Sequence, residues 1–236
     1  MPTTLLLLPG LMCDAAVWAP QVPVLSGHAR CVVPDWGPLD SLTAMAEHVL
    51  ATAPTPTFAL AGHSMGGRVA LEVMRLAPAR VQRLALLDTG TQPLPAGEAG
   101  EKERAGRLAL LALAHTEGMR TMGRQWLRGM VHPDVLGTAL FESVLDMLER
   151  SSPAQFAAQI NALLTRPDAA TVLPTITCPT SVLCGREDYW SPPEQHAQIA
   201  DGITGATLHV IEHCGHMPTV EQPAELNRAL VAWLQG

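Results

Sequence analysis

Lysine is almost absent from this chain of 236 residues, in which Lys102 is the only one. A phosphate-binding loop that ends in Gly-Lys-Ser or Gly-Lys-Thr is therefore excluded. Lys102 lies in the charged run EKERAGR, which argues against a Schiff-base lysine because such a lysine needs an apolar pocket. The formal net charge of −7 provides no basic surface for a nucleic acid, so none is expected as a partner.

Long apolar runs and a cysteine framework are also missing. No stretch approaches the roughly 18 apolar residues of a membrane span, and the leucine run near the N-terminus is ended by Pro9 and has no basic flank. We therefore expect neither a signal peptide nor a membrane-bound protein. The five cysteines are an odd number scattered along the chain, which predicts reduced thiols and a cytoplasmic location.

Short apolar runs alternate with longer segments of helical periodicity. Most of the runs are continuously apolar, as in strands that are covered on both faces. They lie at 4–8, 31–34, 58–61, 84–87, 181–184 and 208–211. Segments 65–77 and 224–234 carry apolar residues at helical spacing. These repeated strand–helix–strand units predict an α/β protein, with a mostly parallel sheet of about six strands flanked by helices.

The strand pattern stops between residues 90 and 166. The segment 91–100 contains two prolines and two glycines and is typical of a linker. The segments that follow it have helical patterns, at 108–114, 119–130, 135–150 and 153–164. We therefore expect a helical lid insertion at 91–166, mounted on a core formed by 1–90 and 167–236.

The most informative motif is Gly62-His63-Ser64-Met65-Gly66, a G-x-S-x-G sequence between an apolar run and a helical segment. In this context the serine occupies a strained corner between strand and helix, with its hydroxyl projecting. The two glycines let strand and helix approach closely, and the start of the helix favours negative charge. The pattern predicts a nucleophilic Ser64, although a glycine-rich turn with a helix-capping serine has the same letters.

A serine hydroxyl needs a base to become a nucleophile, and that base must be held by an acid. Among the nine histidines, His216 fits best because it lies in a loop after the last predicted strand, where open α/β sheets place reactive groups. His213, three residues earlier, is the alternative. His63 should point away from the corner, and His209 lies within a predicted strand.

The expected acid is Asp188, in a Gly-Arg-Glu-Asp sequence that follows another predicted strand. Its function would be to hold the imidazole tautomer and to stabilise the imidazolium. The neighbouring Glu187 is a local alternative. Asp88 follows the predicted strand 84–87 and offers a second position for the acid, unless it is a turn or helix-cap residue. The expected triad is thus Ser64, Asp188 and His216 in chain order.

This order resembles that of the α/β-hydrolase superfamily, in particular its small lid-bearing esterases, lactonases and carbon–carbon hydrolases. The motifs that carry the resemblance are Gly-His-Ser-Met-Gly-Gly at 62–67, Gly-Arg-Glu-Asp at 185–188 and Gly-His-Met-Pro at 215–218. The resemblance implies an oxyanion hole formed by the backbone N–H groups of Met65 and Leu11. The chain has Pro-Gly in the loop before Leu11, where the family usually has His-Gly.

The resemblance implies a hydrolase that needs no cofactor. We expect Ser64 to attack a small or medium carboxylic ester, as in a carboxylesterase, and water to hydrolyse the resulting acyl-enzyme. Thioesterases, lactonases, carbon–carbon hydrolases and cofactor-free haloperoxidases or perhydrolases of the superfamily use the same triad, so the motifs do not separate these activities. A non-catalytic ligand-binding protein of the same fold is a further alternative. The protein could be a monomer or a homodimer.

A zinc site is the main competing interpretation of the histidine-rich loop. His209, His213, Cys214 and His216 have a spacing that zinc could use. No second cluster of ligands matches that spacing, so we expect no metal.

The predicted insertion carries Arg120, Arg124 and Arg128 at four-residue spacing. This spacing is typical of the solvated face of an amphipathic helix. The alternative is that these arginines bind an anionic substrate or an acyl carrier. Large apolar side chains near the motifs and in the insertion are expected to line the substrate pocket. They are Trp18, Met119, Met122, Trp126, Met130, Trp190 and Met217.

Overall fold

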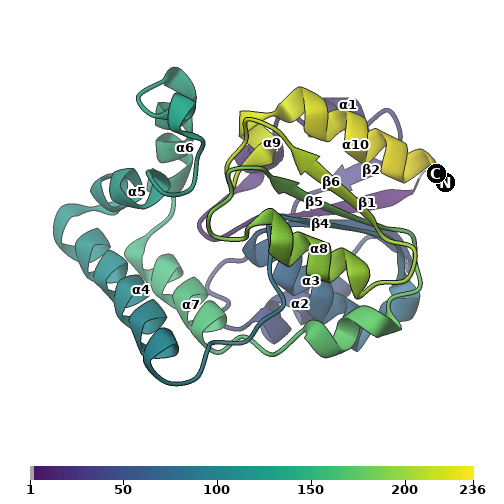
Figure 1. Cartoon of the computed structure of the whole chain (residues 1–236), viewed down its shortest axis with the longest axis horizontal. Helices are drawn as coiled ribbons and strands as arrows, with labels where there is room; N and C mark the ends of the chain where they lie inside the picture. The colour runs from purple at the N-terminus through teal and green to yellow at the C-terminus, as the bar shows by residue number, and fades with distance from the viewer. Residues whose placement is uncertain (1–2) are drawn as a thin grey trace.

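The computed structural model describes residues 3–236 and contains a six-stranded parallel sheet between two layers of helices (Figure 1). The strand order is β2-β1-β3-β4-β5-β6, and every neighbouring pair is parallel. The strands are β1 (Thr4–Leu8), β2 (Arg30–Val32), β3 (Phe58–His63), β4 (Val81–Leu87), β5 (Thr180–Gly185) and β6 (Thr207–Ile211). The predicted α/β class and parallel sheet are confirmed.

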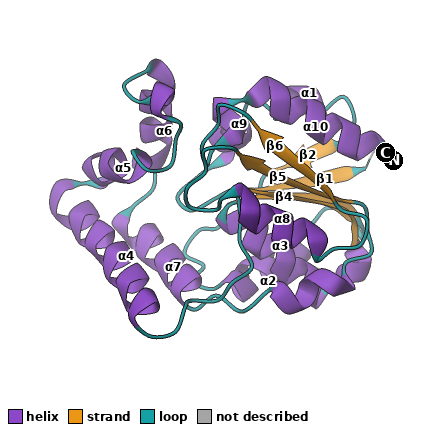
Figure 2. Cartoon of the chain, in the orientation of Figure 1, coloured by secondary structure: helices purple, strands orange, loops and turns teal. Residues whose placement is uncertain are grey.

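Helices cover both faces of the sheet, as Figure 2 shows. One layer contains α2 (Leu42–Thr52), α3 (Met65–Leu76) and α8 (Pro193–Asp201), and the other contains α1 (Val22–Leu25), α9 (Pro218–Glu221) and α10 (Pro223–Gln235). Every residue of β1, β3 and β5 is buried between the layers, which explains why these strands read as unbroken apolar or small runs. Strand β6 lies at an edge, and its first three residues are exposed.

The strand register places the carboxyl ends of the strands along one edge of the sheet. Leu8 pairs with Gly62, and His63 pairs with Leu87. Leu87 in turn pairs with Leu183 in β5. The loops that follow β1, β3, β4, β5 and β6 therefore meet at this edge, which is where an open parallel sheet binds its ligands.

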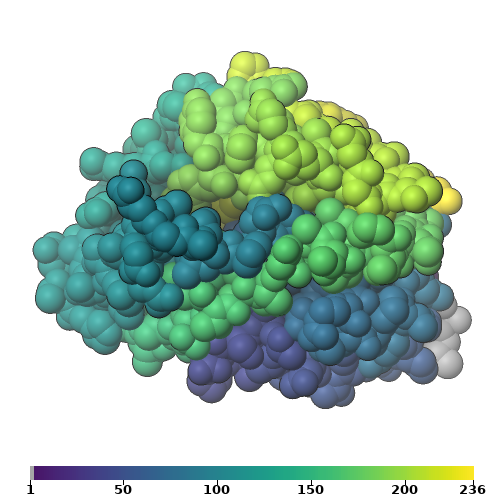
Figure 3. All heavy atoms as spheres, turned by 60° about the horizontal axis from the view of Figure 1, so that its bottom comes forward, coloured from purple at the N-terminus to yellow at the C-terminus, as the bar shows by residue number. Residues whose placement is uncertain are grey.

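Four α-helices and no strand lie between β4 and β5. They are α4 (Glu98–Glu117), α5 (Met119–Leu127), α6 (Ala139–Glu149) and α7 (Pro153–Leu164). Figure 1 shows these helices beyond the carboxyl ends of the strands, and the space-filling view shows them beside the core (Figure 3). Side chains cap two of them, because Thr138 accepts a hydrogen bond at the start of α6 and Ser152 at the start of α7.

Helix α4 is longer than the sequence pattern predicted. It begins at Glu98, inside the predicted linker 91–100, and continues through the predicted helix 108–114. Its first half is largely exposed and rich in charged residues, so it carries no apolar periodicity that would reveal a helix. None of the helices within residues 3–236 is long and apolar enough to cross a membrane.

Candidate active site

Ser64 lies on the tight turn between β3 and α3, with a φ of 55°. Its backbone N–H donates to the Leu87 carbonyl oxygen at 2.8 Å, which fixes the turn against β4. The two motif glycines are required by close backbone contacts. A Cβ on Gly62 would lie 2.3 Å from the Gly66 carbonyl oxygen, and one on Gly66 would lie 2.3 Å from the Leu8 carbonyl oxygen. The G-x-S-x-G pattern therefore produces the strained corner that holds the serine hydroxyl at the sheet edge.

The structure brings Ser64, His216 and Asp188 into one chain of hydrogen bonds. The loop after β6 places His216 Nε2 2.8 Å from Ser64 Oγ. The loop after β5 places Asp188 Oδ2 2.7 Å from His216 Nδ1. Because a carboxylate accepts at Nδ1–H, Nε2 is left to accept from the serine hydroxyl. This is the arrangement that can make a serine nucleophilic.

Asp188 is buried and ionised. Burial by itself would raise the pKa of Asp188, but the interaction and hydrogen bond with His216 and two backbone N–H donors lower it below the usual aspartate range. Those donors are Trp190 and Ser191, at 2.9 and 3.0 Å from Oδ1. The carboxylate therefore has a fixed orientation as well as a negative charge.

A second carboxyl group, Asp88, lies at the end of β4 beside Asp188. Its Oδ1 accepts from the Gly185 N–H at 2.9 Å, and its Oδ2 receives no hydrogen bond from residues 3–236. Burial and the neighbouring charge of Asp188 raise the pKa of Asp88 well above the usual range, which favours the neutral form of this group. Asp88 does not contact His216 by a hydrogen bond, and Asp188 therefore occupies the position of the acid.

Asp88, Asp188 and His216 are also the one group of possible metal ligands that lies close together in the described chain, within 4.8 Å of one another. The imidazole of this group is already engaged at both ring nitrogens, by Asp188 at Nδ1 and by Ser64 at Nε2. His216 therefore offers no free nitrogen to a metal ion while the hydrogen-bonded chain is intact. The histidines and the cysteine of the competing zinc interpretation do not come together as a ligand group, and His209 and His213 are exposed.

The other candidate bases do not reach the serine. His63 is buried, and its Nε2–H donates to the His216 carbonyl oxygen at 2.7 Å. Burial, then the proximity of His216, lowers the pKa of His63 to about 4, so the ring is neutral. His63 thus holds the backbone of His216 in place. His213 is exposed, and its ring lies against that of His132.

Glu221, which the sequence analysis did not single out, anchors the loop that carries His216. Its Oε2 accepts from the N–H groups of His132 and Gly215 at 2.7 and 3.1 Å, and its Oε1 accepts from the Met217 N–H at 2.9 Å. Glu221 is the last residue of the four-residue helix α9 and resembles an ordinary surface acid in the sequence, so no local signal reveals this function.

Two more contacts fix the same loop. The His216 N–H donates to the Met130 carbonyl oxygen at 2.6 Å, which ties the loop to the segment after α5. Glu187, the local alternative for the acid, accepts from the Cys214 N–H at 2.9 Å instead of contacting the imidazole. The position of His216 therefore depends on backbone contacts from both sides.

The two predicted oxyanion donors are free. The N–H groups of Leu11 and Met65 donate to no acceptor in the described part of the chain, and both residues line the cavity that contains Ser64. The loop after β1 is held by Gln159 of α7, whose Oε1 accepts from the Met12 N–H at 2.7 Å. Preorganised, unpartnered N–H groups beside a nucleophile are suited to stabilise a developing oxyanion.

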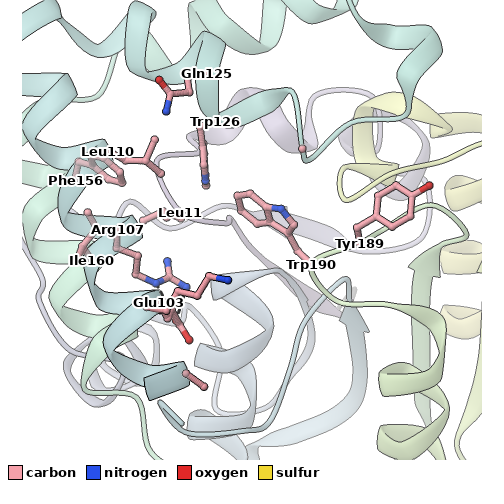
Figure 4. Close-up of a pocket in the computed structure, with 14 residues that line it drawn as sticks. Leu11, Glu103, Arg107, Leu110, Gln125, Trp126, Phe156, Ile160, Tyr189 and Trp190 are labelled. Carbon is pink, nitrogen blue, oxygen red and sulfur yellow. Dashed lines mark hydrogen bonds and ion pairs between the residues drawn. The ribbon is translucent and has the colours of Figure 1, made fainter. Parts of the chain in front are cut away.

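Two adjoining cavities lie above the sheet edge. The inner cavity, of about 360 Å³, contains Ser64 and His216. The outer cavity, of about 1020 Å³, is bounded by α4, α5, α7 and the loop after β5 (Figure 4). Leu11, Trp126 and Trp190 are among the residues that line both. The outer cavity therefore leads to the inner one past the two tryptophans.

Among the apolar residues predicted to line the pocket, Trp126 and Trp190 do so. Their ring centroids are 5.5 Å apart, and the Trp190 ring lies 5.7 Å from that of His216. Figure 4 shows both indoles projecting into the outer cavity, with Tyr189 turned away from them. The remaining predicted pocket residues are buried and line neither cavity: Trp18, Met119, Met122, Met130 and Met217. Helical spacing cannot separate core methionines from pocket methionines, since both face inward.

The arginines at four-residue spacing lie away from the cavities, two of them on α5 and Arg128 directly after it. Arg120 pairs with Asp146 and Glu149 of α6, at 2.6 and 2.8 Å. Arg124 pairs with a further α6 carboxylate at 3.1 Å, and Arg128 is exposed. None of these three arginines lines either cavity. Carboxylates of the neighbouring helix offset the charges of Arg120 and Arg124.

A parallel sheet with a serine on the turn after β3, and an aspartate and a histidine after later strands, is the arrangement of an α/β hydrolase. Comparison with known proteins agrees with this class. The sequence model of the alpha/beta hydrolase family matches residues 5–229, and the chain belongs to that family. The protein is therefore a hydrolase of the alpha/beta type.

Its relatives are named for different substrates. A putative carbamate hydrolase, RutD, of Variovorax paradoxus is 29% identical over 97% of this chain and 90% of its own length. A 2-hydroxy-6-oxononadienedioate/2-hydroxy-6-oxononatrienedioate hydrolase of Cupriavidus pinatubonensis is 27% identical over 95% of this chain and 75% of its own. Among solved structures, a thermophilic esterase from Thermogutta terrifontis has a TM-score of 0.86 and 26% identity, covering 99% of this chain and 91% of its own.

Proposed function

We propose that this protein hydrolyses small or medium carboxylic esters through an acyl-enzyme at Ser64. The observation that carries the proposal is the hydrogen-bonded chain from Asp188 through His216 to Ser64, which ends in a cavity where two backbone N–H groups are free. Acyl transfer needs a hydroxyl, a base that is held by an acid, and free N–H donors, and all three meet at this point.

The mechanism follows from these contacts. Ser64 Oγ attacks the ester carbonyl while its proton moves to His216 Nε2, 2.8 Å away. The charge that develops on the carbonyl oxygen is stabilised by the N–H groups of Leu11 and Met65, each worth about 3–4 kcal/mol in comparable sites. Asp188 stabilises the imidazolium, which then protonates the leaving alcohol. Water attacks the acyl-enzyme by the same route in reverse.

Residues 91–166 act as a lid in this proposal. Trp126 of α5 and Trp190 of the loop after β5 lie between the outer cavity and the imidazole. Their rings give the entrance an apolar wall, which excludes water from one side of the scissile bond. No bound cofactor takes part in any step.

Hydrolysis of carbon–carbon bonds or carbamates is the second candidate, and it rests on the names of the relatives. The Variovorax protein is named as a carbamate hydrolase and the Cupriavidus protein as a hydrolase of a dienedioate or trienedioate. The proton that His216 removes from the serine can be given to an alcohol or to an amine leaving group, so we favour esters on structural likeness and not on the triad. The thermophilic esterase supports the same choice.

The proposal is tested with a chain-length series of p-nitrophenyl esters beside acyl-thioesters, lactones and carbamates. We expect turnover of short esters, labelling by a fluorophosphonate, and loss of both in Ser64→Ala. The matched control is Ser143→Ala, because Ser143 is an exposed serine on α6. Ester turnover that survives in Ser64→Ala would refute the mechanism. Faster turnover of a thioester, lactone or carbamate would show that this bond, and not the ester, is the substrate.

A further inference from the structure

Three arginines line the inner cavity beside Ser64, and they come from different parts of the chain. Arg68 is on α3, Arg107 is on α4, and Arg166 follows α7. Among the residues that line this cavity, only Glu103 and Asp88 carry carboxyl groups. The arginines therefore outnumber the carboxyl groups in the lining of the proposed reaction site.

Glu103 is fully engaged by two of the arginines. Arg166 contacts both of its carboxylate oxygens, at 2.7 and 2.8 Å, and Arg107 Nε donates to Oε1 at 2.9 Å. The remaining donors of Arg166 are used by backbone carbonyl oxygens. Arg166 therefore serves the packing of the loop, and Glu103 is the shared partner of Arg166 and Arg107.

Arg68 is different, because no carboxylate contacts it in residues 3–236. Its one hydrogen bond runs from NH1 to the Gln92 carbonyl oxygen at 2.9 Å. Burial, with the proximity of Arg166 and Arg107, lowers the pKa of Arg68 to about 9, so it keeps its charge at neutral pH. A partly buried guanidinium without an anionic partner is costly and calls for one.

A second donor converges with Arg68 at one point. A Cβ placed on Gly90 would lie 2.3 Å from Gln195 Nε2 and 2.8 Å from Arg68 NH2. Neither nitrogen donates to an acceptor in the described chain. The two groups come from α8 and α3, so the fold brings two free donors together beside Gly90 at the wall of the inner cavity.

We propose that the substrate carries a carboxylate that binds Arg68, with Gln195 and Arg107 beside it, on the acyl side of the scissile bond. Arg68 lies four residues after Ser64, one turn along the same face of α3, so a short chain joins the two groups. The planar guanidinium matches a carboxylate in shape and charge. The inner cavity retains the acyl part, while the wider outer cavity can take the leaving group.

The substrate class is thus a monoester of a short dicarboxylic acid, which rests on the proposed ester hydrolysis. Lys102 lines the outer cavity and adds positive potential along the entrance, which favours the approach of an anion. The arginines at 120, 124 and 128 have no part in this site, because they line neither cavity.

The experiment compares mono-p-nitrophenyl glutarate with its methyl ester, which has the same acyl length without the charge. We expect the wild type to prefer the free acid by about tenfold or more in kcat/KM, since one charge-assisted hydrogen bond separates the two substrates. Arg68→Gln should bring this ratio close to one, Arg68→Lys should retain part of it, and high salt should lower it. Arg124→Gln, which removes a charge outside the cavities, should leave the ratio unchanged.

A second measurement is independent of turnover. Glutarate binding to Ser64→Ala is followed by calorimetry, and the double variant Ser64→Ala/Arg68→Gln is expected to bind about tenfold or more weakly. Equal kcat/KM values for the two esters in the wild type, or equal losses for both in Arg68→Gln, would overturn the carboxylate site. Absence of glutarate binding by folded protein would do the same. Turnover that persists in Ser64→Ala would instead refute the proposed mechanism. The glutarate measurement would then still show whether the carboxylate site at Arg68 exists.

Discussion

The pKa values of two adjacent carboxyl groups at the sheet edge, Asp88 and Asp188, are shifted in opposite directions, and exchanging each group for its amide should separate their functions. Asp188→Asn removes the negative charge that stabilises the imidazolium and changes the tautomer that the imidazole adopts. Its kcat should fall by about 10⁴-fold. Asp88→Asn replaces a protonated carboxyl group by a neutral isostere that can still accept from the Gly185 N–H. Its kcat should stay within about threefold of the wild type.

The raised pKa of Asp88 also makes the stability of the protein depend on pH. The pKa of Asp88 is raised in the folded protein, so its contribution to stability is complete below the unfolded pKa, near about 4, and is lost as the pH rises toward the raised value. Asparagine does not titrate and avoids this loss. Relative to the wild type, Asp88→Asn should therefore gain up to about 1.4 kcal/mol in unfolding free energy for each pH unit in that window.

The assay is urea unfolding followed at several pH values from about 4 upward, with ester turnover measured on the same preparations. Asp168→Asn is the matched control, because Asp168 is exposed and its substitution should leave the unfolding free energy without this pH trend. A difference between Asp88→Asn and the wild type that does not change with pH would refute the protonated state of Asp88. A loss of turnover as large as that of Asp188→Asn would refute the assignment of the acid.

Three further predictions concern the framework of the site. Because burial lowers the pKa of His63 to about 4, the protein should lose up to about 3 kcal/mol of stability between pH ~6.5 and ~4, and His63→Gln should lessen this loss in urea unfolding. Glu221→Ala leaves three N–H groups unpaired, so its kcat should fall about tenfold or more. The control Glu225→Ala changes an exposed residue of α10 and should keep the wild-type kcat. Gly62→Ala should abolish labelling by a fluorophosphonate, because its Cβ overlaps the Gly66 carbonyl oxygen.

The sequence predicted the sheet well because strands buried on both faces are marked by local composition alone. Strand β1 has the predicted bounds 4–8, and α7 has the predicted bounds 153–164. The residues of the hydrogen-bonded chain were also accessible, since each follows a strand in a recognisable short motif. Local signals were sufficient wherever one segment alone determines the structure.

The sequence could not predict contacts made between distant segments. Gln159 reaches a backbone N–H that is 147 residues away in the chain, and nothing around it distinguishes it from other helical glutamines. Arg68 is visible one turn after the serine, yet it resembles a surface residue of α3 until Gln195 and Arg107 are placed beside it. The arginines on α5 had the more regular spacing, but their acidic partners lie on α6. Charge compensation is a tertiary property, so spacing along one helix does not show which cations remain free.

The segment that joins α5 to α6 connects the wall of the cavity with the position of the base. Met130 accepts the His216 N–H, and Glu221 holds the backbone of His132 and of Gly215 together. A Cβ on Gly215 would lie 2.4 Å from the Met130 carbonyl oxygen, so the two loops are in direct backbone contact. A shift of this segment must therefore move the imidazole relative to Ser64, and substitutions there should change kcat together with KM. Substitutions at Arg68 act on the other side of the serine and have no such connection to His216, so substrate charge preference can change at that end while the base stays in place.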